Sequence, residues 1–243
     1  MAPFPRIRSA SPSAVSLGLG ARAALAGGLL CWAGFAMLAA LTLTGHFAPF
    51  DEAGLRYWRT SDGTAGANML PWVHALTLLG GVPVRGALDI AIVALLAFLQ
   101  RRREAWWLAL TVAGGWVANS ALKLAVGRTR PDVVPHLVDA GGASFPSGHS
   151  FNSAALYIAI ALVLGAASGR RWTPWLLLAG AVALSLAIAW SRVWLGVHFP
   201  GDVAAGWLGG AGWTLLAWAW LRRDEFSPAR FPVSERNPGQ AEE

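Results

Sequence analysis

Six long apolar segments, separated by polar connections, run along most of this chain. They lie at roughly 23–44, 82–100, 104–123, 149–167, 173–191 and 203–221. Each segment has about 18–22 residues, close to the ~20 residues that a helix needs to cross the hydrocarbon core of a bilayer. The pattern therefore predicts an all-α, polytopic membrane protein built as a bundle of six transmembrane helices.

The connections between these segments differ in length. The Arg-rich connections at 101–103 and 169–171 are short, so we expect the segments on either side of each to form antiparallel helical hairpins. The connections at 45–81 and 124–148 are longer, and long connections in a bundle tend to carry function. Residues 68–80 are apolar but too few to cross a bilayer, which predicts an interfacial or re-entrant helix in the first long connection.

Composition supports a single membrane domain with two polar ends. The chain is 55% hydrophobic and 13% charged, which is unusual for a soluble domain. We interpret 23–221 as the membrane domain, 1–22 as a flexible cytoplasmic N-terminus and 222–243 as a disordered cytoplasmic tail. The first apolar run is longer than that of a usual signal peptide, so we expect an uncleaved span. The single cysteine, Cys31, lies in that span, and a disulfide framework is excluded.

The distribution of basic residues predicts the orientation of the bundle. With both termini placed in the cytoplasm, twelve of the nineteen Lys and Arg residues fall in the termini and inner connections, and the other seven fall in outer segments. The net charge of +6 therefore reports topology, and nucleic acid is not an expected partner. We expect a multi-pass protein of a bacterial-type inner membrane, with the two long connections on the extracytoplasmic side.

Three polar motifs stand on that outer side. They are Lys123 with Arg130 and Pro131; Pro146, Ser147, Gly148 and His149; and Ser191, Arg192, His198 and Asp202. Each alone has an ordinary explanation, namely a snorkelling lysine, a capped helix start or an interfacial histidine. Together they supply cations, two imidazoles, a carboxylate and a glycine at a helix N-terminus. This combination is suited to binding a phosphate dianion.

The same residue types also suit phosphoryl transfer. His198 and Asp202 are four residues apart, so in a helical turn the carboxylate can accept Nδ1–H and leave Nε2 unprotonated. His149 can serve as an acid and then as a base, while the cations offset charge on the phosphate oxygens. The sequence offers no obvious carboxylate cage for a divalent metal. We therefore predict metal-independent hydrolysis without a cofactor.

In this order and spacing, Lys-x6-Arg-Pro, Pro-Ser-Gly-His and Ser-Arg-x5-His-x3-Asp resemble the three signature motifs of the type 2 phosphatidic acid phosphatase superfamily, with every position filled. The resemblance implies that His198 is a nucleophile that forms a phosphohistidine and that Asp202 fixes its tautomer. It implies that His149 protonates the leaving oxygen and then activates water. The residues implied to hold the phosphate oxygens are Lys123, Arg130, Ser147, Gly148 and Arg192.

The apolar surroundings predict a membrane lipid as the substrate, entering from the side with its tail in the bilayer. Undecaprenyl pyrophosphate is the first choice, because recycling of that carrier places phosphate on the outer face. Phosphatidate, phosphatidylglycerol phosphate and lipid A phosphates are alternatives. A phosphotransferase that uses the same site also stays open. A non-catalytic lipid-binding or transport protein is disfavoured by the intact histidines, and a haloperoxidase by the membrane spans.

Several other residues carry weaker signals. Arg85 and Asp89, four apart in the second span, predict an ion pair facing the bundle interior near the substrate headgroup. Arg128 either adds to the positive field or faces lipid phosphates. The remaining histidines, His46, His74 and His136, are interpreted as interfacial packing residues. Glycines at 206, 209, 210 and 212 permit close helix approach and give weak support to a homodimer.

Overall fold

The structure is a computed structural model that describes residues 18–58 and 67–226. Eight α-helices are found in these ranges: α1 Ala21–Leu43, α2 Ala48–Tyr57, α3 Leu70–Leu79, α4 Val82–Phe98, α5 Arg102–Val126, α6 Gly148–Ala166, α7 Thr173–Trp194 and α8 Pro200–Leu221. Short 3-10 turns lie at Ala67–Met69 and Arg223–Phe226, and the described ranges contain no β-strand. The predicted all-α fold class is confirmed. Most of the two predicted flexible ends lies outside the described residues.

Each of the six predicted apolar segments forms a helix with bounds close to those expected. By length and composition, α1, α5, α6 and α7 can each cross a membrane, and α3 with α4 forms a pair bent by 44° that can count as a fifth, broken span. α8 is as long as α7 but rich in glycine and tryptophan, and it is not among these candidates. A multi-span architecture is therefore confirmed, while the count of six stays a prediction.

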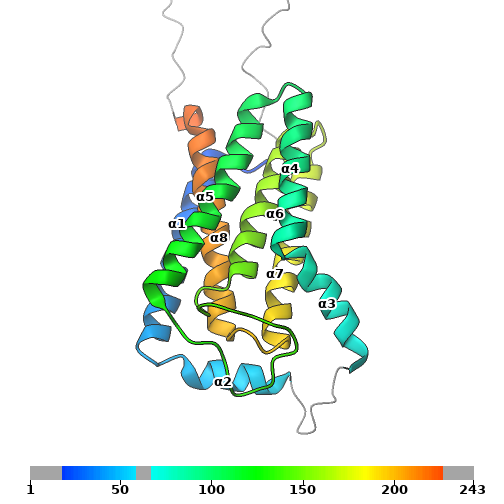
Figure 1. Cartoon of the computed structure of the whole chain (residues 1–243). Coiled ribbons are helices and arrows are strands. Elements are labelled where there is room, and N and C mark those ends of the chain that lie inside the picture. The colour runs from blue at the N-terminus through cyan, green and yellow to red at the C-terminus, as the bar shows by residue number, and fades with distance from the viewer. Residues whose placement is uncertain (1–17, 59–66, 227–243) are drawn as a thin grey trace, which may run out of the picture.

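The first long connection contains two helices instead of one. α3 corresponds to the segment expected at 68–80, and its interfacial or re-entrant placement stays a prediction. α2 was not predicted, because its short Ala48–Tyr57 sequence mixes apolar and charged residues. Figure 1 shows α2 lying across one end of the bundle, beside the 127–147 connection. Both long connections therefore gather at the same end.

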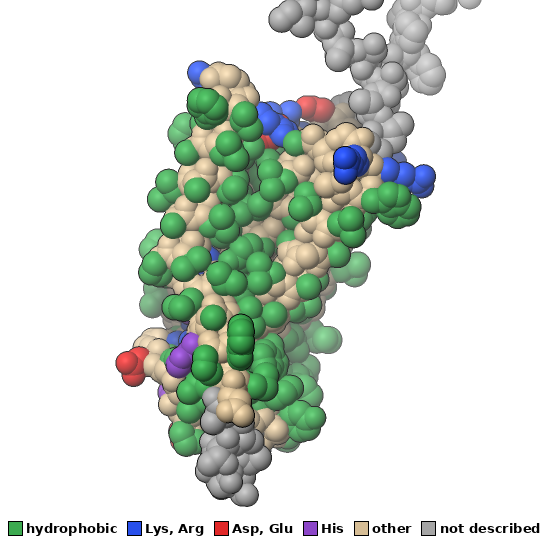
Figure 2. Space-filling model, turned by 90° about the vertical axis from the view of Figure 1, so that its right-hand side faces the viewer, with side chains coloured by type: hydrophobic (Ala, Val, Ile, Leu, Met, Phe, Trp, Pro, Cys, Tyr) green, Lys and Arg blue, Asp and Glu red, His purple; other side chains and the backbone are tan. Residues whose placement is uncertain are grey.

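The described chain ends lie together at the opposite end of the bundle. The backbone N–H of Ala21 donates to Glu225 across 2.8 Å, and the indole of Trp218 donates to the carbonyl of Leu19 across 2.9 Å. Figure 2 shows Lys and Arg side chains gathered at this end, with hydrophobic side chains covering most of the face below them. This separation of charged and apolar surface agrees with a multi-pass membrane protein.

Glycines on α8 allow it to pack closely on α6 and α1. A Cβ atom added to Gly210 would lie 2.0 Å from the carbonyl oxygen of Phe151, and one added to Gly206 would lie 2.7 Å from that of Ser147. Gly212 approaches Trp32 on α1 in the same way. The glycine stripe is thus used inside the chain and draws the start of α8 against the start of α6. These glycines therefore give no support to a homodimer, which stays a prediction.

Candidate active site

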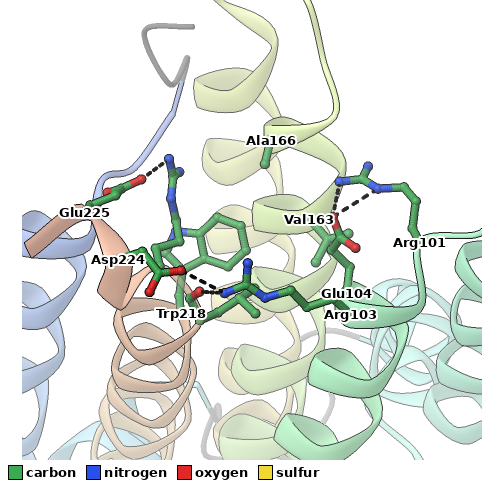
Figure 3. A pocket seen from close by; sticks show the side chains of 10 residues that line it. Arg101, Arg103, Glu104, Val163, Ala166, Trp218, Asp224 and Glu225 are labelled. Atoms are coloured by element: carbon green, nitrogen blue, oxygen red, sulfur yellow. Dashed lines mark hydrogen bonds and ion pairs between the residues drawn. The ribbon is translucent and has the colours of Figure 1, made fainter. Parts of the chain in front are cut away.

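A cavity of about 370 Å³ lies at the end of the bundle that holds the described chain ends (Figure 3). Its charged lining residues are Arg101, Arg103, Arg222, Glu104, Asp224 and Glu225. Each of the three arginines forms an ion pair with one of the three acids. Because its cations are already neutralised, this cavity is a poor phosphate site. The three sequence motifs lie at the other end.

The Pro-Ser-Gly-His motif forms the start of α6. Ser147 occupies the N-cap position as expected, but its side chain makes no capping hydrogen bond. The Ser147 hydroxyl is buried without a partner in the described structure, while its backbone N–H donates to the carbonyl of Asp202 across 2.9 Å. The unpartnered hydroxyl, together with the first N–H groups of α6, is available to an anion.

Lys123 approaches the same helix start from α5. Its Cε would lie 3.5 Å from a Cβ atom on Gly148, and Asn119 Oδ1 would lie 3.3 Å from it. Glycine at 148 therefore makes room for both α5 side chains. The ammonium of Lys123 donates to the carbonyl of Ala143 across 2.6 Å. Asn119, one turn before Lys123, was not predicted; it is 3% exposed, and its Nδ2 has no partner within the described ranges.

Arg130 is held in the 127–147 connection by backbone carbonyls. Its guanidinium donates to Gly141 across 2.7 Å, to Gly142 across 3.1 Å and to Val197 across 2.8 Å. Nη1 also contacts Nε2 of His198 across 3.1 Å. Burial lowers the pKa of Arg130, but an arginine side chain stays charged at neutral pH. The bonds to carbonyls fix where this charge points.

Arg192 reaches the site from the last turn of α7 and is 5% exposed. Its Nη1 donates to the hydroxyl of Thr77 on α3 across 2.8 Å. Its Nε is buried with no partner in the part of the chain that the structure describes. Thr77 was not predicted, and it fixes the orientation of a guanidinium that still has an N–H group to donate.

His198 lies between α7 and α8, is 2% exposed, and has a defined tautomer. Because arginine has no acceptor, the contact with Arg130 requires Nε2 of His198 to accept, which leaves the proton on Nδ1. Burial lowers the pKa of His198 to about 4, against the opposing effect of Asp202. The imidazole is therefore neutral at pH 7 and carries its lone pair on Nε2.

The expected contact between His198 and Asp202 is long, and a third residue supports it. Nδ1 of His198 lies 3.6 Å from Oδ2 of Asp202, too far for a good hydrogen bond, and 3.3 Å from the hydroxyl of Ser144. The Ser144 hydroxyl in turn donates to Oδ2 of Asp202. The predicted direct contact between Nδ1 and the carboxylate is therefore present only as a long ion pair, and the Ser144 hydroxyl lies beside it in contact with both groups.

Arg128 faces two carboxylates, so the predicted contact with lipid phosphates is wrong, while its contribution to the positive field stays a prediction. Its Nη1 donates to Asp202 across 2.6 Å, and its Nη2 donates to Asp51 of α2 across 2.7 Å. Asp51 is fully buried and also accepts the N–H of Gly201 across 2.7 Å. The ring of Phe199 lies under the guanidinium, with the ring centroid 4.1 Å from Cζ of Arg128. The arginine therefore links α2 to the start of α8.

His149 is the second residue of α6 and lies against the break between α3 and α4. A Cβ atom on Gly80 would be 2.9 Å from its Cδ2. The imidazole lies within electrostatic range of Arg192, Arg130 and His198. It makes no hydrogen bond to another described residue, so both ring nitrogens are available. The structure thus brings the predicted residues of all three motifs to the same end of the bundle.

The other candidates have separate environments. His46 contacts the Thr44 hydroxyl across 2.8 Å, and His136 contacts the Pro131 carbonyl across 2.7 Å, so both are held locally. Among the described residues, no three His, Cys, Asp or Glu side chains group as metal ligands. The predicted ion pair between Arg85 and Asp89 is wrong, because no such pair is found in the described ranges.

The comparison with known families agrees with this geometry. A family model described as the PAP2 superfamily matches residues 104–226, a range that contains all three motifs. The chain belongs to the PAP2 superfamily. This membership confirms the resemblance found in the three motifs and assigns the chain to a superfamily that includes multi-pass membrane phosphatases.

Similar proteins are found in two bacteria. Phosphatidylglycerophosphatase B of Bacillus subtilis (strain 168) is 34% identical over 148 residues, which cover 56% of this chain and 69% of that protein. A decaprenylphosphoryl-5-phosphoribose phosphatase of Mycobacterium tuberculosis (strain ATCC 25618 / H37Rv) is 36% identical over 127 residues, or 50% of this chain and 63% of that protein. The crystal structure of a transmembrane PAP2-type phosphatidylglycerolphosphate phosphatase from Bacillus subtilis matches with a TM-score of 0.73 and 26% identity, covering 84% of this chain and 98% of that one.

Proposed function

We propose that this PAP2 protein hydrolyses a lipid phosphate or pyrophosphate at the outer membrane face, through a phosphohistidine and without a metal ion. The observation that carries the proposal is the contact between Arg130 and Nε2 of His198. It places a neutral, correctly protonated imidazole beside a fixed guanidinium, as nucleophilic attack on a bound phosphate requires.

In the first step, Nε2 of His198 forms a bond to phosphorus while the bond from phosphorus to the leaving oxygen breaks. Lys123, Arg130 and Arg192 stabilise the charge on the equatorial phosphate oxygens, together with the N–H groups at the start of α6. The bound phosphate dianion offsets the positive charge of Arg192 and Arg130 near His149, which allows His149 to take up a proton and give it to the leaving oxygen. The positive charge that develops on His198 is stabilised by Asp202, 3.6 Å from Nδ1, and by the Ser144 hydroxyl beside it.

In the second step, water attacks the phosphorus and the bond between phosphorus and Nε2 breaks. His149, neutral after the first step, accepts a proton from the water as it attacks. Inorganic phosphate and free His198 are the products, and the proton taken up restores His149 for the next cycle. An acceptor hydroxyl in place of water would give the phosphotransferase alternative.

The extracytoplasmic placement rests on the sequence and on the arrangement of the connections. The long connections that carry the motifs gather at the end opposite the Arg-rich turns, and the positive-inside rule assigns the Arg-rich end to the cytoplasm. A lipid can then present its phosphate to the site from the outer leaflet while its tail remains in the bilayer.

Two substrates are the leading candidates. The sequence favours undecaprenyl pyrophosphate, whose recycling requires an outer phosphatase. Phosphatidylglycerol phosphate is supported by the extent of the two matches to phosphatases of that lipid. By name, both curated relatives act on lipids with a phosphoryl group between the lipid and the phosphorylated glycerol or ribose. Undecaprenyl pyrophosphate, phosphatidylglycerol phosphate and the phosphorylated ribose lipid thus each keep one phosphate on the lipid after hydrolysis.

The test is phosphate release by the purified full-length protein in detergent, with EDTA, from a panel of lipid phosphates. We expect turnover of at least one lipid, and loss of about 10³-fold or more for His198→Ala. Activity abolished by EDTA would overturn the metal-free mechanism, and substantial turnover by His198→Ala would overturn the nucleophile assignment. Transfer of the phosphate to an added alcohol, with little free phosphate, would favour the phosphotransferase.

A further inference from the structure

Arg85 is a buried cation that the proposed mechanism does not use. It lies in the first turn of α4 and is 8% exposed. Its Nε donates to the carbonyl of Gly80 across 2.7 Å, and the described residues provide no carboxylate partner for its charge. An unpaired charge in a membrane-spanning helix is costly, so it is usually retained to bind or move something.

The surroundings of Arg85 place it beside the leaving-group side of the site. Gly80, whose carbonyl accepts from Arg85, packs directly against His149, the proposed proton donor to the leaving oxygen. Arg85 also lies within electrostatic range of His149 and of Tyr157, whose hydroxyl donates to the neighbouring carbonyl of Leu79 across 2.8 Å. The guanidinium therefore lies just beyond His149.

On its other side, Arg85 lines an open groove of about 280 Å³ between α4 and α5. Apart from Arg85 and Asp89, the groove is lined by apolar or small residues: Val82, Gly86, Val112, Ala113 and Trp116. The order of environments leading away from the reacting phosphate is thus an imidazole, a guanidinium and then an apolar groove. A lipid with a second phosphate between its tail and the reacting phosphate has the complementary order of groups.

We infer that Arg85 binds the second phosphate of the substrate, the one that stays on the lipid when the first is removed. The inference rests on the proposed function and narrows its substrate class to lipids whose leaving group is itself anionic. Two sources share this chemistry: a diphosphate, in which the phosphates are adjacent, and a phosphodiester separated from the terminal phosphate by glycerol or a sugar. A monoester such as phosphatidate has no group for Arg85.

The experiment compares two matched pairs of substrates, farnesyl diphosphate with farnesyl phosphate, and phosphatidylglycerol phosphate with phosphatidate. The native protein, Arg85→Gln, Arg85→Lys and Arg102→Gln are assayed for kcat/KM in detergent. We expect Arg85→Gln to lower kcat/KM by about 10- to 100-fold for the doubly phosphorylated member of a pair, as for the loss of a charge-assisted hydrogen bond to phosphate. The singly phosphorylated member is expected to change by less than about 3-fold.

The two other variants separate charge from structure. Arg85→Lys keeps the charge but loses the planar fork, so we expect an intermediate loss on the same substrates. Arg102→Gln removes an exposed arginine in the first turn of α5, at the opposite end of the bundle, and is expected to match the native protein within about 2-fold on all four substrates. A loss seen only with farnesyl diphosphate means that Arg85 binds a diphosphate. A loss seen only with phosphatidylglycerol phosphate means that Arg85 binds a phosphodiester.

The inference is overturned if Arg85→Gln reduces all four activities equally, or reduces none. If Arg85→Gln does not fold, the native protein decides: it must prefer the doubly phosphorylated member of at least one pair by about 10-fold or more. Equal use of both members in both pairs refutes the inference while leaving the proposed phosphatase intact. Failure of the native protein to release phosphate from any of the four lipids refutes the proposed function and the inference with it.

Discussion

Arg130 donates a hydrogen bond to Nε2 of His198 across 3.1 Å, so the cation and the proposed nucleophile are partners before a phosphate arrives. The contact fixes the imidazole tautomer, because Nε2 must accept. A phosphate oxygen is a stronger acceptor for a guanidinium than an imidazole nitrogen. When phosphate binds, Arg130 can therefore turn to an oxygen while holding the phosphorus close to the released lone pair.

This arrangement predicts that lysine cannot replace Arg130. A lysine ammonium lacks the planar fork that bonds to the carbonyls of Gly141, Gly142 and Val197 as well as to His198. We expect Arg130→Lys to lower kcat/KM for phosphate release by about 100-fold, with a similar yield of folded protein. Arg170→Lys, in an exposed connection, is the matched control and should be neutral. Native activity in Arg130→Lys would contradict the assigned role.

Ser144 is predicted to position His198 without contacting the phosphate. Ser144→Ala removes the hydroxyl that contacts both Nδ1 of His198 and Asp202, so the imidazole loses a group that helps to hold its proton and its orientation. We expect kcat to fall by about 10-fold, with KM changed by less than about 2-fold. Rapid-quench measurement of phosphoenzyme formation should show the same loss. A rise in KM with unchanged kcat would instead indicate a direct contact with substrate.

The helices and the positions of the motifs were predictable from the sequence because both depend on local patterns. Apolar runs long enough to span a bilayer gave the locations of α1 and α4–α8 to within a few residues. The three motifs are defined by short spacings, and the family match confirms the resemblance they support. The alternation of long and short connections predicted that the two long ones meet at the same end of the bundle.

The residues that hold the site in place were missed because their partners are distant in sequence. Asp51 and Arg128 are 77 positions apart, and Thr77 and Arg192 are 115 apart. α2 has only ten residues and little apolar character, so its amphipathic pattern is too short to mark it as a helix in a chain of long apolar spans. Ser144 stands in an irregular connection, where a serine carries no signal until His198 and Asp202 are placed beside it.

Asp51 is predicted to support catalysis from α2 through Arg128. Asp51→Asn keeps a hydrogen-bond acceptor for the N–H of Gly201 but removes the charge that shares Arg128 with Asp202. Arg128 then pairs with Asp202 alone, which leaves less of the negative charge of Asp202 to stabilise the imidazole of His198. We therefore expect kcat to fall by about 10-fold. Glu52→Gln, the exposed neighbour on the same helix, is the control. Equal activity of the two variants would limit α2 to a structural role.

Gly210 is predicted to be essential for the contact between α6 and α8. A methyl group there would lie 2.0 Å from the carbonyl oxygen of Phe151, a backbone atom that can move only with its helix. We expect Gly210→Ala to destabilise the protein by about 1–3 kcal/mol or more and to lower its thermal midpoint in detergent. Gly180→Ala on α7 meets no atom within 4 Å and should leave the midpoint unchanged. Equal midpoints would contradict the packing of these helices.

His198 is predicted to make stability depend on pH. Burial lowers its pKa from 6.5 to about 4 in the folded protein. Above pH 6.5 His198 is neutral in both the folded and the unfolded states, so its protonation does not reduce the stability of the folded protein. As pH falls from 6.5 towards 4, the unfolded chain takes up a proton that the folded protein excludes, so stability is lost over this window.

The pH effect is measured as the thermal midpoint of the native protein and of His198→Gln in the same detergent between pH 7.5 and pH 4. Glutamine is neutral throughout, so the native midpoint should fall more steeply than that of the variant below about pH 6.5. Carboxylates elsewhere titrate in both proteins, so their effect on the thermal midpoint cancels when the two curves are subtracted. Parallel curves would mean that His198 is protonated as easily in the folded site as in the unfolded chain, and would remove the basis for a neutral nucleophile held by burial.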